Sequence, residues 1–74
     1  MSDELKIGDV FEFAEPGWII RRDIFRLAMQ RAEKAHRMKL GPITYSKEKD
    51  EQIGNILVGR AAVIEVYGKA DADA

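Results

Sequence analysis

The residues best suited to binding chemistry are seven cations between positions 18 and 40, namely Arg21, Arg22, Arg26, Arg31, Lys34, Arg37 and Lys39. Five of them are arginines, and a planar guanidinium can give two hydrogen bonds at once to a carboxylate or a phosphate. Such a set could meet a nucleic-acid backbone, another phosphate-bearing ligand or an acidic protein surface. It could equally form a solvated helix face whose charge is neutralised within the chain.

Catalytic chemistry has few candidates in this sequence. The chain has no cysteine, and its two serines, Ser2 and Ser46, fall in a polar terminus and a charged stretch. Nucleophilic catalysis needs a hydroxyl or a thiol beside a base. Acid–base catalysis by paired carboxylates would require Glu12 and Glu65 to meet across a sheet. We predict no catalytic residue and expect that the protein is not an enzyme.

Metal and cofactor sites are also not indicated. His36 is the single histidine, and we interpret it as a boundary residue half covered by a sheet, with a pH-sensitive contact as the alternative. Glu33 lies three residues before it, but a metal site needs further ligands that the sequence does not supply. The glycines lack the Lys-Ser/Thr pair of a phosphate-binding loop. We therefore predict neither a metal nor a cofactor.

Charge is unevenly distributed along the chain. Residues 1–17 hold one base and five acids (−4), residues 18–40 hold seven bases and two acids (+5), and residues 41–74 hold four bases and six acids (−2), which gives −1. The middle segment can therefore create a local positive field. The isoelectric point of about 5.8 argues against a nucleic-acid-binding protein. The aromatic residues that could stack on bases, Trp18 and Tyr45, are not interleaved with the arginines.

Size and composition indicate one small domain. A chain of 74 residues is near the lower limit for an autonomous core. No stretch approaches the roughly 20 apolar residues of a membrane span, and the polar N-terminus lacks the apolar run of a signal peptide. We expect a cytoplasmic protein with no membrane partner. Residues 1–5 are predicted to be frayed, residues 6–68 to form a single α+β domain, and residues 69–74 to be a disordered tail.

The N-terminal part is predicted to form a β-hairpin. Residues 6–9 read as a turn, and residues 10–13 are rich in strand formers. Pro16 and Gly17 suit the two central positions of a type II turn. Residues 18–22 would then return as a second strand, although a helix that begins near Trp18 is a competing interpretation.

A single long helix is predicted from residue 24 to residue 39. Asp23 is a suitable N-cap, and Gly41 followed by Pro42 is a typical stop signal. At about 100° per residue an apolar arc forms from Ile24, Leu27, Ala28, Ala32, Ala35 and Met38, with Phe25 and Met29 at one side. Arg31 falls inside this arc. Either its stem lies along the edge of the core, or it pairs with Glu12 or Glu65.

The C-terminal part is predicted to form short strands. Residues 43–45 read as one strand, and residues 46–52 as a charged, solvated connection. Residues 56–58 and 61–67 are strand-like, with Gly59 as a bulge or turn between them. In the last strand we expect Ala62, Ile64 and Val66 to form the consistently apolar face.

Together these elements predict an α+β fold, in which an N-terminal β-hairpin and C-terminal strands form a small antiparallel sheet packed on one long amphipathic helix. The alternative is a small SH3-like, partly closed barrel with an inserted helix. The apolar helix flank (Phe25, Met29, Ala32, His36) and the outer sheet face (Val10, Val63, Tyr67) are wider than one sheet needs. A homodimer is therefore a further expectation.

For function, we predict a small non-catalytic binding or regulatory protein that contacts an acidic protein partner through a basic helix face. Short, cysteine-free chains with segregated charge are common among phage and mobile-element accessory factors, and we expect a protein of this kind. The predicted binding residues are Arg21, Arg22, Arg26, Lys34, Arg37 and Trp18. The alternative is a module that binds nucleic acid or a phosphate ligand through the same surface.

Overall fold

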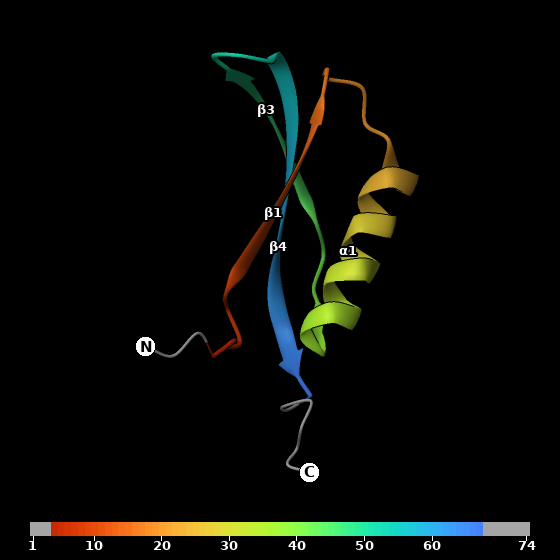
Figure 1. Cartoon of the computed structure of the whole chain (residues 1–74), viewed down its shortest axis with the longest axis vertical. Coiled ribbons are helices and arrows are strands. Elements are labelled where there is room, and N and C mark those ends of the chain that lie inside the picture. The colour runs from red at the N-terminus through yellow and green to blue at the C-terminus, as the bar shows by residue number, and fades with distance from the viewer. Residues whose placement is uncertain (1–3, 68–74) are drawn as a thin grey trace.

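The longest strand, β4 (Gly54–Val66), is the centre of the fold in the computed structural model, which describes residues 4–67 (Figure 1). β1 (Val10–Pro16) pairs with residues 56–62 of β4, and β3 (Thr44–Asp50) pairs with residues 54–60. Because these two stretches overlap, β1 and β3 must lie on opposite sides of β4. β2 (Met38–Leu40) pairs with the far end of β4, on the same side as β3. All pairings are antiparallel.

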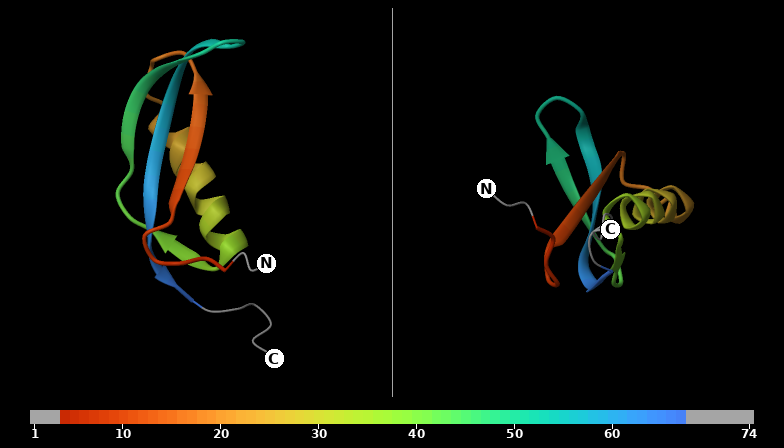
Figure 2. Two further views of the ribbon diagram at one scale, coloured as in Figure 1. Left: turned by 90° about the vertical axis from the view of Figure 1, so that its left-hand side faces the viewer. Right: turned by 60° about the horizontal axis from the view of Figure 1, so that its bottom comes forward.

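The sheet is open rather than closed into a barrel, and the one helix packs against it. The helix α1 (Arg22–His36) lies on one face, and within residues 4–67 no other element covers the opposite face (Figures 1 and 2). The predicted α+β class is confirmed, and the SH3-like barrel is not formed. No helix within the described part of the chain is long and apolar enough to cross a membrane.

The Phe25 side chain of α1 packs directly against the backbone of Gly59 in β4. A Cβ atom added there would stand 2.6 Å from Ile43 Cδ1 and 3.1 Å from two ring carbons of Phe25. Phe25 is 1% exposed and also packs edge-to-face against Tyr45, with 5.2 Å between ring centroids. Gly59 is therefore not a turn between two strands, as predicted, but the place in a continuous strand where the Phe25 ring fits.

The core lies between α1 and the covered face of the sheet. Its buried apolar residues are Phe25, Met38, Leu40, Leu57, Ala61 and Val63. Met29 and Ala32 pack partly against this cluster, as do Phe11 and Phe13. The chain's own sheet thus covers most of the helix flank that we interpreted as surplus, and Val63 is buried as well. On the outer sheet face Val10 (59% exposed) and Tyr67 (56%) remain exposed, so only part of this reason is lost, and the homodimer stays a prediction.

The N-terminal hairpin is not formed. Gly17 turns the chain with φ +86°, and its N–H donates to the Asn55 carbonyl at 2.7 Å. Residues 17–21 adopt no strand, and the Trp18 indole Nε1–H donates to the Glu48 carbonyl of β3 at 3.1 Å. The connection from β1 to α1 therefore leaves the β1 side of the sheet and reaches β3. Trp18 anchors it there.

Both predicted ends of the helix were wrong by a few residues. The helix begins at Arg22, and Asp23 lies in the first turn, where its charge suits the helix dipole, rather than at the N-cap. It ends at His36 because Arg37 turns left-handed (φ 53°, ψ 58°), with its N–H bonded to the Glu33 carbonyl. Residues 38–40 then form β2, so Gly41 and Pro42 follow a strand and not a helix.

The buried side of the helix is rotated from the predicted arc. Phe25 is at its centre, whereas Leu27 is 48% exposed and Ala35 is also exposed. Arg31 is exposed as well. Of its two predicted carboxylate partners, Glu12 pairs with Arg60 instead. The basic side chain therefore lies outside the core, as the first of the two interpretations required.

The C-terminal half contains two long strands, where the sequence predicted three short ones (residues 43–45, 56–58 and 61–67). β3 takes up most of the predicted charged connection. Asp50 Oδ1 accepts the N–H groups of Gln52 (2.8 Å) and Ile53 (3.0 Å), and Gly54 (φ +94°) completes the turn into β4. This arrangement makes β3 and β4 a hairpin.

A β-bulge in β4 changes which residues face the core. Leu40 pairs with Val63 and Lys39 with Glu65, so Ile64 has no partner in β2. The alternation of side chains therefore shifts by one residue at Ile64. Val63 is buried, whereas Ile64 (44% exposed) and Val66 (37%) are not, so the predicted apolar face of this strand was wrong.

The turn predicted before β1 is confirmed. The Lys6 N–H donates to Asp9 Oδ2 at 2.9 Å, the Asp9 N–H returns to the Lys6 carbonyl at 3.1 Å, and Gly8 has φ +100°. Leu5, which lies in the segment predicted to be frayed (residues 1–5), packs against the core cluster. The expectations for residues 1–3 and 69–74 lie outside the described residues.

The Gly59→Ala substitution is expected to destabilise the fold by about 1–3 kcal/mol, because the added methyl group meets the buried Phe25 ring. Without a clash, replacing glycine by alanine would stabilise the chain slightly through the unfolded state. Urea unfolding measures the difference. Asn55→Ala, at an exposed position of the same strand, is the control and should stay within about 0.5 kcal/mol of wild type. A Gly59→Ala chain as stable as wild type would contradict the close approach.

Candidate binding groove along the helix

Two adjoining hollows follow the flank of α1 that faces the β2–β3 side of the sheet. The first, of about 490 Å³, is lined by Arg22, Arg26, Met29, Gln30, Glu33, Gly41, Pro42, Ile43 and Tyr45. The second, of about 550 Å³, is lined by Gln30, Glu33, Lys34, Arg37, Met38, Lys39 and Tyr67. Gln30 and Glu33 line both, so the hollows form one continuous depression, here called the basic groove.

Helix geometry explains why the cations collect on this flank. Arg22, Arg26 and Gln30 are spaced four residues apart and therefore lie above one another on the helix surface. Lys34 and Arg37 continue the same side. The opposite wall comes from the segment that joins β2 to β3 (Gly41, Pro42, Ile43) and from Tyr45 in β3.

Four of the six predicted binding residues line the groove, and two do not. Arg22 and Arg26 line the first hollow, and Lys34 and Arg37 the second. Arg21 is the helix N-cap, and its carbonyl accepts the N–H groups of Ile24 (3.1 Å) and Phe25 (3.2 Å). Trp18 is tied to β3, and Lys47 Nζ lies 5.8 Å from the centre of its ring. The structure adds Lys39, Gln30 and Glu33 to the set.

Within residues 4–67, no ion pair neutralises the cations of the groove. Arg22, Arg26, Lys34, Arg37 and Lys39 are all exposed. Between residues of the described part, the two ion pairs both belong to Arg60, which lies on the other face of the sheet. We find no contact within residues 4–67 that supports the alternative interpretation, in which acidic segments fold over the basic helix and cancel its charge.

Glu33 is the one acidic residue of the described part that lines the groove, and it lines both hollows, where they adjoin. Its carboxylate accepts the Leu40 N–H at 2.9 Å in a partly buried position. This bond ties α1 to the outer edge of β2 and holds the negative charge in place. In the second hollow, the pKa of Tyr67 is raised, mainly by a hydrogen bond to Glu65 and further by burial and by the charges of Glu65 and Glu33.

The groove thus offers a pattern of charge rather than a uniform field. Two cations lie at the Arg22 end, three at the Arg37 end, and one fixed carboxylate lies between them. Met29, Pro42 and Ile43 give the first hollow a partly apolar wall. Such an arrangement can bind carboxylate or phosphate groups at both ends, because an exposed guanidinium group can donate paired hydrogen bonds to either kind of anion.

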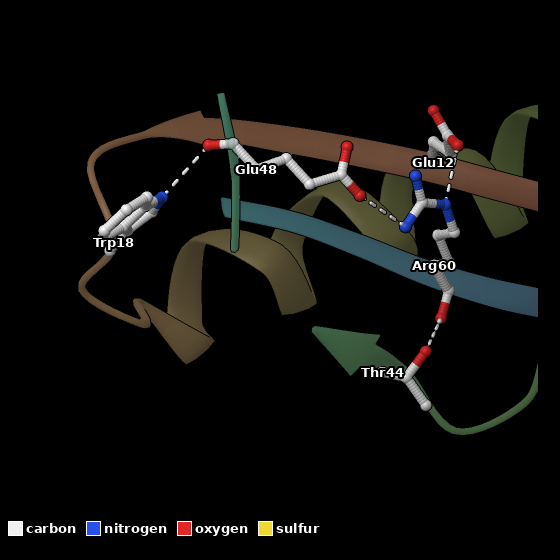
Figure 3. Close-up of polar contacts among 5 residues, drawn as sticks. All are labelled: Glu12, Trp18, Thr44, Glu48 and Arg60. Carbon is white, nitrogen blue, oxygen red and sulfur yellow. Dashed lines mark hydrogen bonds and ion pairs between the residues drawn. The ribbon is translucent and has the colours of Figure 1, made fainter. Parts of the chain in front are cut away.

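A second charged cluster, which the sequence did not indicate, lies on the open face of the sheet. Arg60 of β4 reaches Glu12 of β1 (Nε–Oε2 2.7 Å) and Glu48 of β3 (Nη1–Oε2 3.0 Å), so three strands are joined by one side chain (Figure 3). Glu48 lies opposite Ile56, and Ile56 precedes Arg60 by four residues in β4. The ion pair between Glu48 and Arg60 therefore passes over Val58, which lies between Ile56 and Arg60. Val58 is 4% exposed although no helix covers this face.

The same register excludes the predicted pair of carboxylates. Glu12 lies opposite Arg60, whereas Glu65 lies opposite Lys39 of β2. The two acids belong to different regions of the sheet and do not form an acid–base pair. Only knowledge of the strand pairing could have revealed that Arg60 is the partner of Glu12.

His36 lies at the end of α1 and packs edge-on against Phe11, with 5.2 Å between ring centroids and 67° between planes. The ring remains exposed, so it is a boundary residue in contact with the sheet, close to the first of the two interpretations. Within residues 4–67, no three His, Asp or Glu side chains are grouped so that they could hold a metal ion.

Comparisons of the chain with protein families, with curated proteins and with solved structures find no match. The geometry and charge of the basic groove are therefore the basis for a functional proposal.

Replacing Arg37 by glycine is expected to stabilise the fold by up to about 1 kcal/mol, because a left-handed residue with a Cβ atom is strained and glycine is not. The backbone bond from residue 37 to Glu33 would remain. Thermal or urea unfolding measures the gain. Arg31→Gly, in the interior of the same helix, is the control and should cost roughly 1 kcal/mol. A loss of stability in Arg37→Gly would show that the arginine side chain itself supports the fold.

Stability is expected to fall as the pH drops from about 5 towards 3, and Glu48 should contribute to that fall. Hydrogen bonds from Arg60 and then from Ser46 lower the pKa of Glu48, so the unfolded chain binds more protons in this range than the folded chain. Glu48→Gln should reduce the pH dependence of the urea midpoint. A part remains, because the N–H groups of Gln52 and Ile53 also lower the pKa of Asp50.

The control for Glu48 is Glu51→Gln, which makes the same change of charge in the exposed turn of the same hairpin. Its urea midpoint should follow pH as the wild-type midpoint does. An unchanged pH dependence in Glu48→Gln would contradict a stabilising role for the Arg60 cluster.

Proposed function

We propose that this protein is a small, non-catalytic binding module that holds an acidic partner protein in the basic groove. The observation that carries the proposal is the position of Arg22, Arg26, Lys34 and Arg37, which line two joined hollows and form no ion pair within residues 4–67. Cations that their own fold leaves exposed on a concave surface are suited to an external anion.

The conformation of Arg37 supports the same proposal. Left-handed residues at helix ends are usually glycine or asparagine, and an arginine there costs conformational energy. Its side chain lines the second hollow beside Lys34. A strained position that keeps a long cation at a groove is understandable if the cation binds a partner.

A protein partner suits the groove better than a nucleic acid. A nucleic-acid backbone carries a charge at every nucleotide, whereas Glu33 places a fixed negative charge in the middle of the groove. A protein surface can present acids at the two ends and none between them. We infer a regulatory or accessory role in the cytoplasm. Nucleic acid or a phosphate ligand at the same residues is the alternative.

Reversing Arg26 and Lys34 to glutamate is expected to weaken partner binding at least about tenfold, because it removes one cation from each end of the groove. The chain serves as bait for affinity capture from cell lysate, with and without nuclease. The control is Arg31→Glu with Lys49→Glu, which changes the net charge equally at exposed positions that line neither hollow. Circular dichroism checks that both variants fold.

A protein that is retained by wild type and by the control, but lost from the groove variant, supports the proposal. Equal retention by both variants contradicts the role of the groove. Loss of the captured material after nuclease treatment identifies nucleic acid as the occupant and rejects the protein partner.

A further inference from the structure

We propose that the basic groove recognises an extended peptide segment with an acidic cluster at each end and an uncharged, partly apolar centre. This inference rests on the proposed function and specifies the chemistry of the partner. It follows from the order of charges along the groove, which is cationic at Arg22 and Arg26, anionic at Glu33, and cationic again at Lys34, Arg37 and Lys39.

The length of the helix sets the length of the segment. A helix of 15 residues spans about 22 Å, which an extended peptide covers with about seven residues. The midpoint of Arg22 and Arg26 and the midpoint of Lys34 and Arg37 are about 17 Å apart along the helix, or about five residues of extended chain. Two acids at each end of a seven-residue segment would match them.

Glu33 makes the centre of the groove selective. Its carboxylate accepts the Leu40 N–H, so it cannot turn away from an approaching anion unless this hydrogen bond breaks. An acid at the centre of the peptide would be repelled, as like charges are at close range. Met29 and Ile43 are partly buried and line the adjacent wall, where an aliphatic side chain can pack.

The groove does not favour recognition by strand addition. The Leu40 N–H is taken by Glu33, and the Glu48 carbonyl near the other end of the β2–β3 side is taken by Trp18. Side chains thus occupy main-chain groups that an added strand would need. Hollows of about 490 and 550 Å³ also suit a single extended chain better than a helix about 10 Å wide. Specificity therefore comes from side-chain charge.

Two labelled peptides of identical composition test the inference by fluorescence anisotropy at low salt. The first, Asp-Glu-Ser-Leu-Ser-Asp-Glu, separates its acids, and the second, Ser-Asp-Asp-Glu-Glu-Leu-Ser, gathers them at the centre. We expect the full-length chain to bind the first at least about fivefold more tightly. Because both peptides carry the same charge, unspecific attraction does not distinguish them.

Glu33→Gln provides the decisive variant, because glutamine keeps an oxygen for the Leu40 N–H but removes the charge. It should bind the second peptide more tightly and bring the ratio of the two affinities close to one. Arg26→Glu with Lys34→Glu should weaken both peptides. Circular dichroism confirms that each variant is folded.

Equal affinity of wild type for the two peptides overturns the inference, and so does a preference that Glu33→Gln leaves unchanged. Failure of both peptides to bind, while the groove variant still loses a captured protein, rejects the peptide but keeps the proposed function. Failure in both experiments rejects both.

Discussion

The contact between the Phe25 ring and the backbone of Gly59 determines how the helix lies on the sheet. Any side chain at residue 59 would meet the ring or Ile43, so a glycine allows α1 to approach β4 this closely. With Phe25 directed at the sheet, a rotation of about 100° per residue turns Arg22, Arg26 and Gln30 towards β2 and β3. Leu27 and Arg31 turn to the opposite flank and are exposed. The groove is therefore a consequence of the packing at one residue.

Local patterns in the sequence were sufficient for the fold class and for the set of cations that share a helix flank. They failed wherever distant residues decide the structure. Residues 18–20 favour a strand by composition, but β1 finds its partner in β4, which is roughly fifty residues away (Val10 opposite Ala62). β3 resembled a loop because its residues are polar. As an edge strand with one neighbour, it keeps Lys47 and Lys49 exposed, so polar side chains do not prevent pairing.

Two single-residue irregularities explain most of the remaining errors. Arg37 ends the helix in a conformation that arginine rarely adopts, so the stop signal at Gly41 and Pro42 was the more ordinary prediction. From residue 61 of β4 onward the buried residues are Ala61 and Val63, which alternate with the predicted Ala62 and Ile64, and the bulge at Ile64 interrupts the period of two beyond them. In the proposed binding site, the sequence indicated Arg22, Arg26, Lys34 and Arg37, which line the groove. It gave no reason to include Glu33, because the contact with Leu40 joins a helix to the strand after it.

The fold uses charge in opposite ways on its two faces. On the open face, Arg60 forms ion pairs with carboxylates from both neighbouring strands, so this cation joins three strands across the sheet surface. On the helix flank, five cations surround the single carboxylate of Glu33. Glu12 and Glu48 lie on the opposite face of the sheet from the groove, and a layer of sheet is about 10 Å thick. Salt screens exposed charges at about this distance. A net charge of −1 therefore does not describe the groove, where the local field remains positive and can attract an acidic partner.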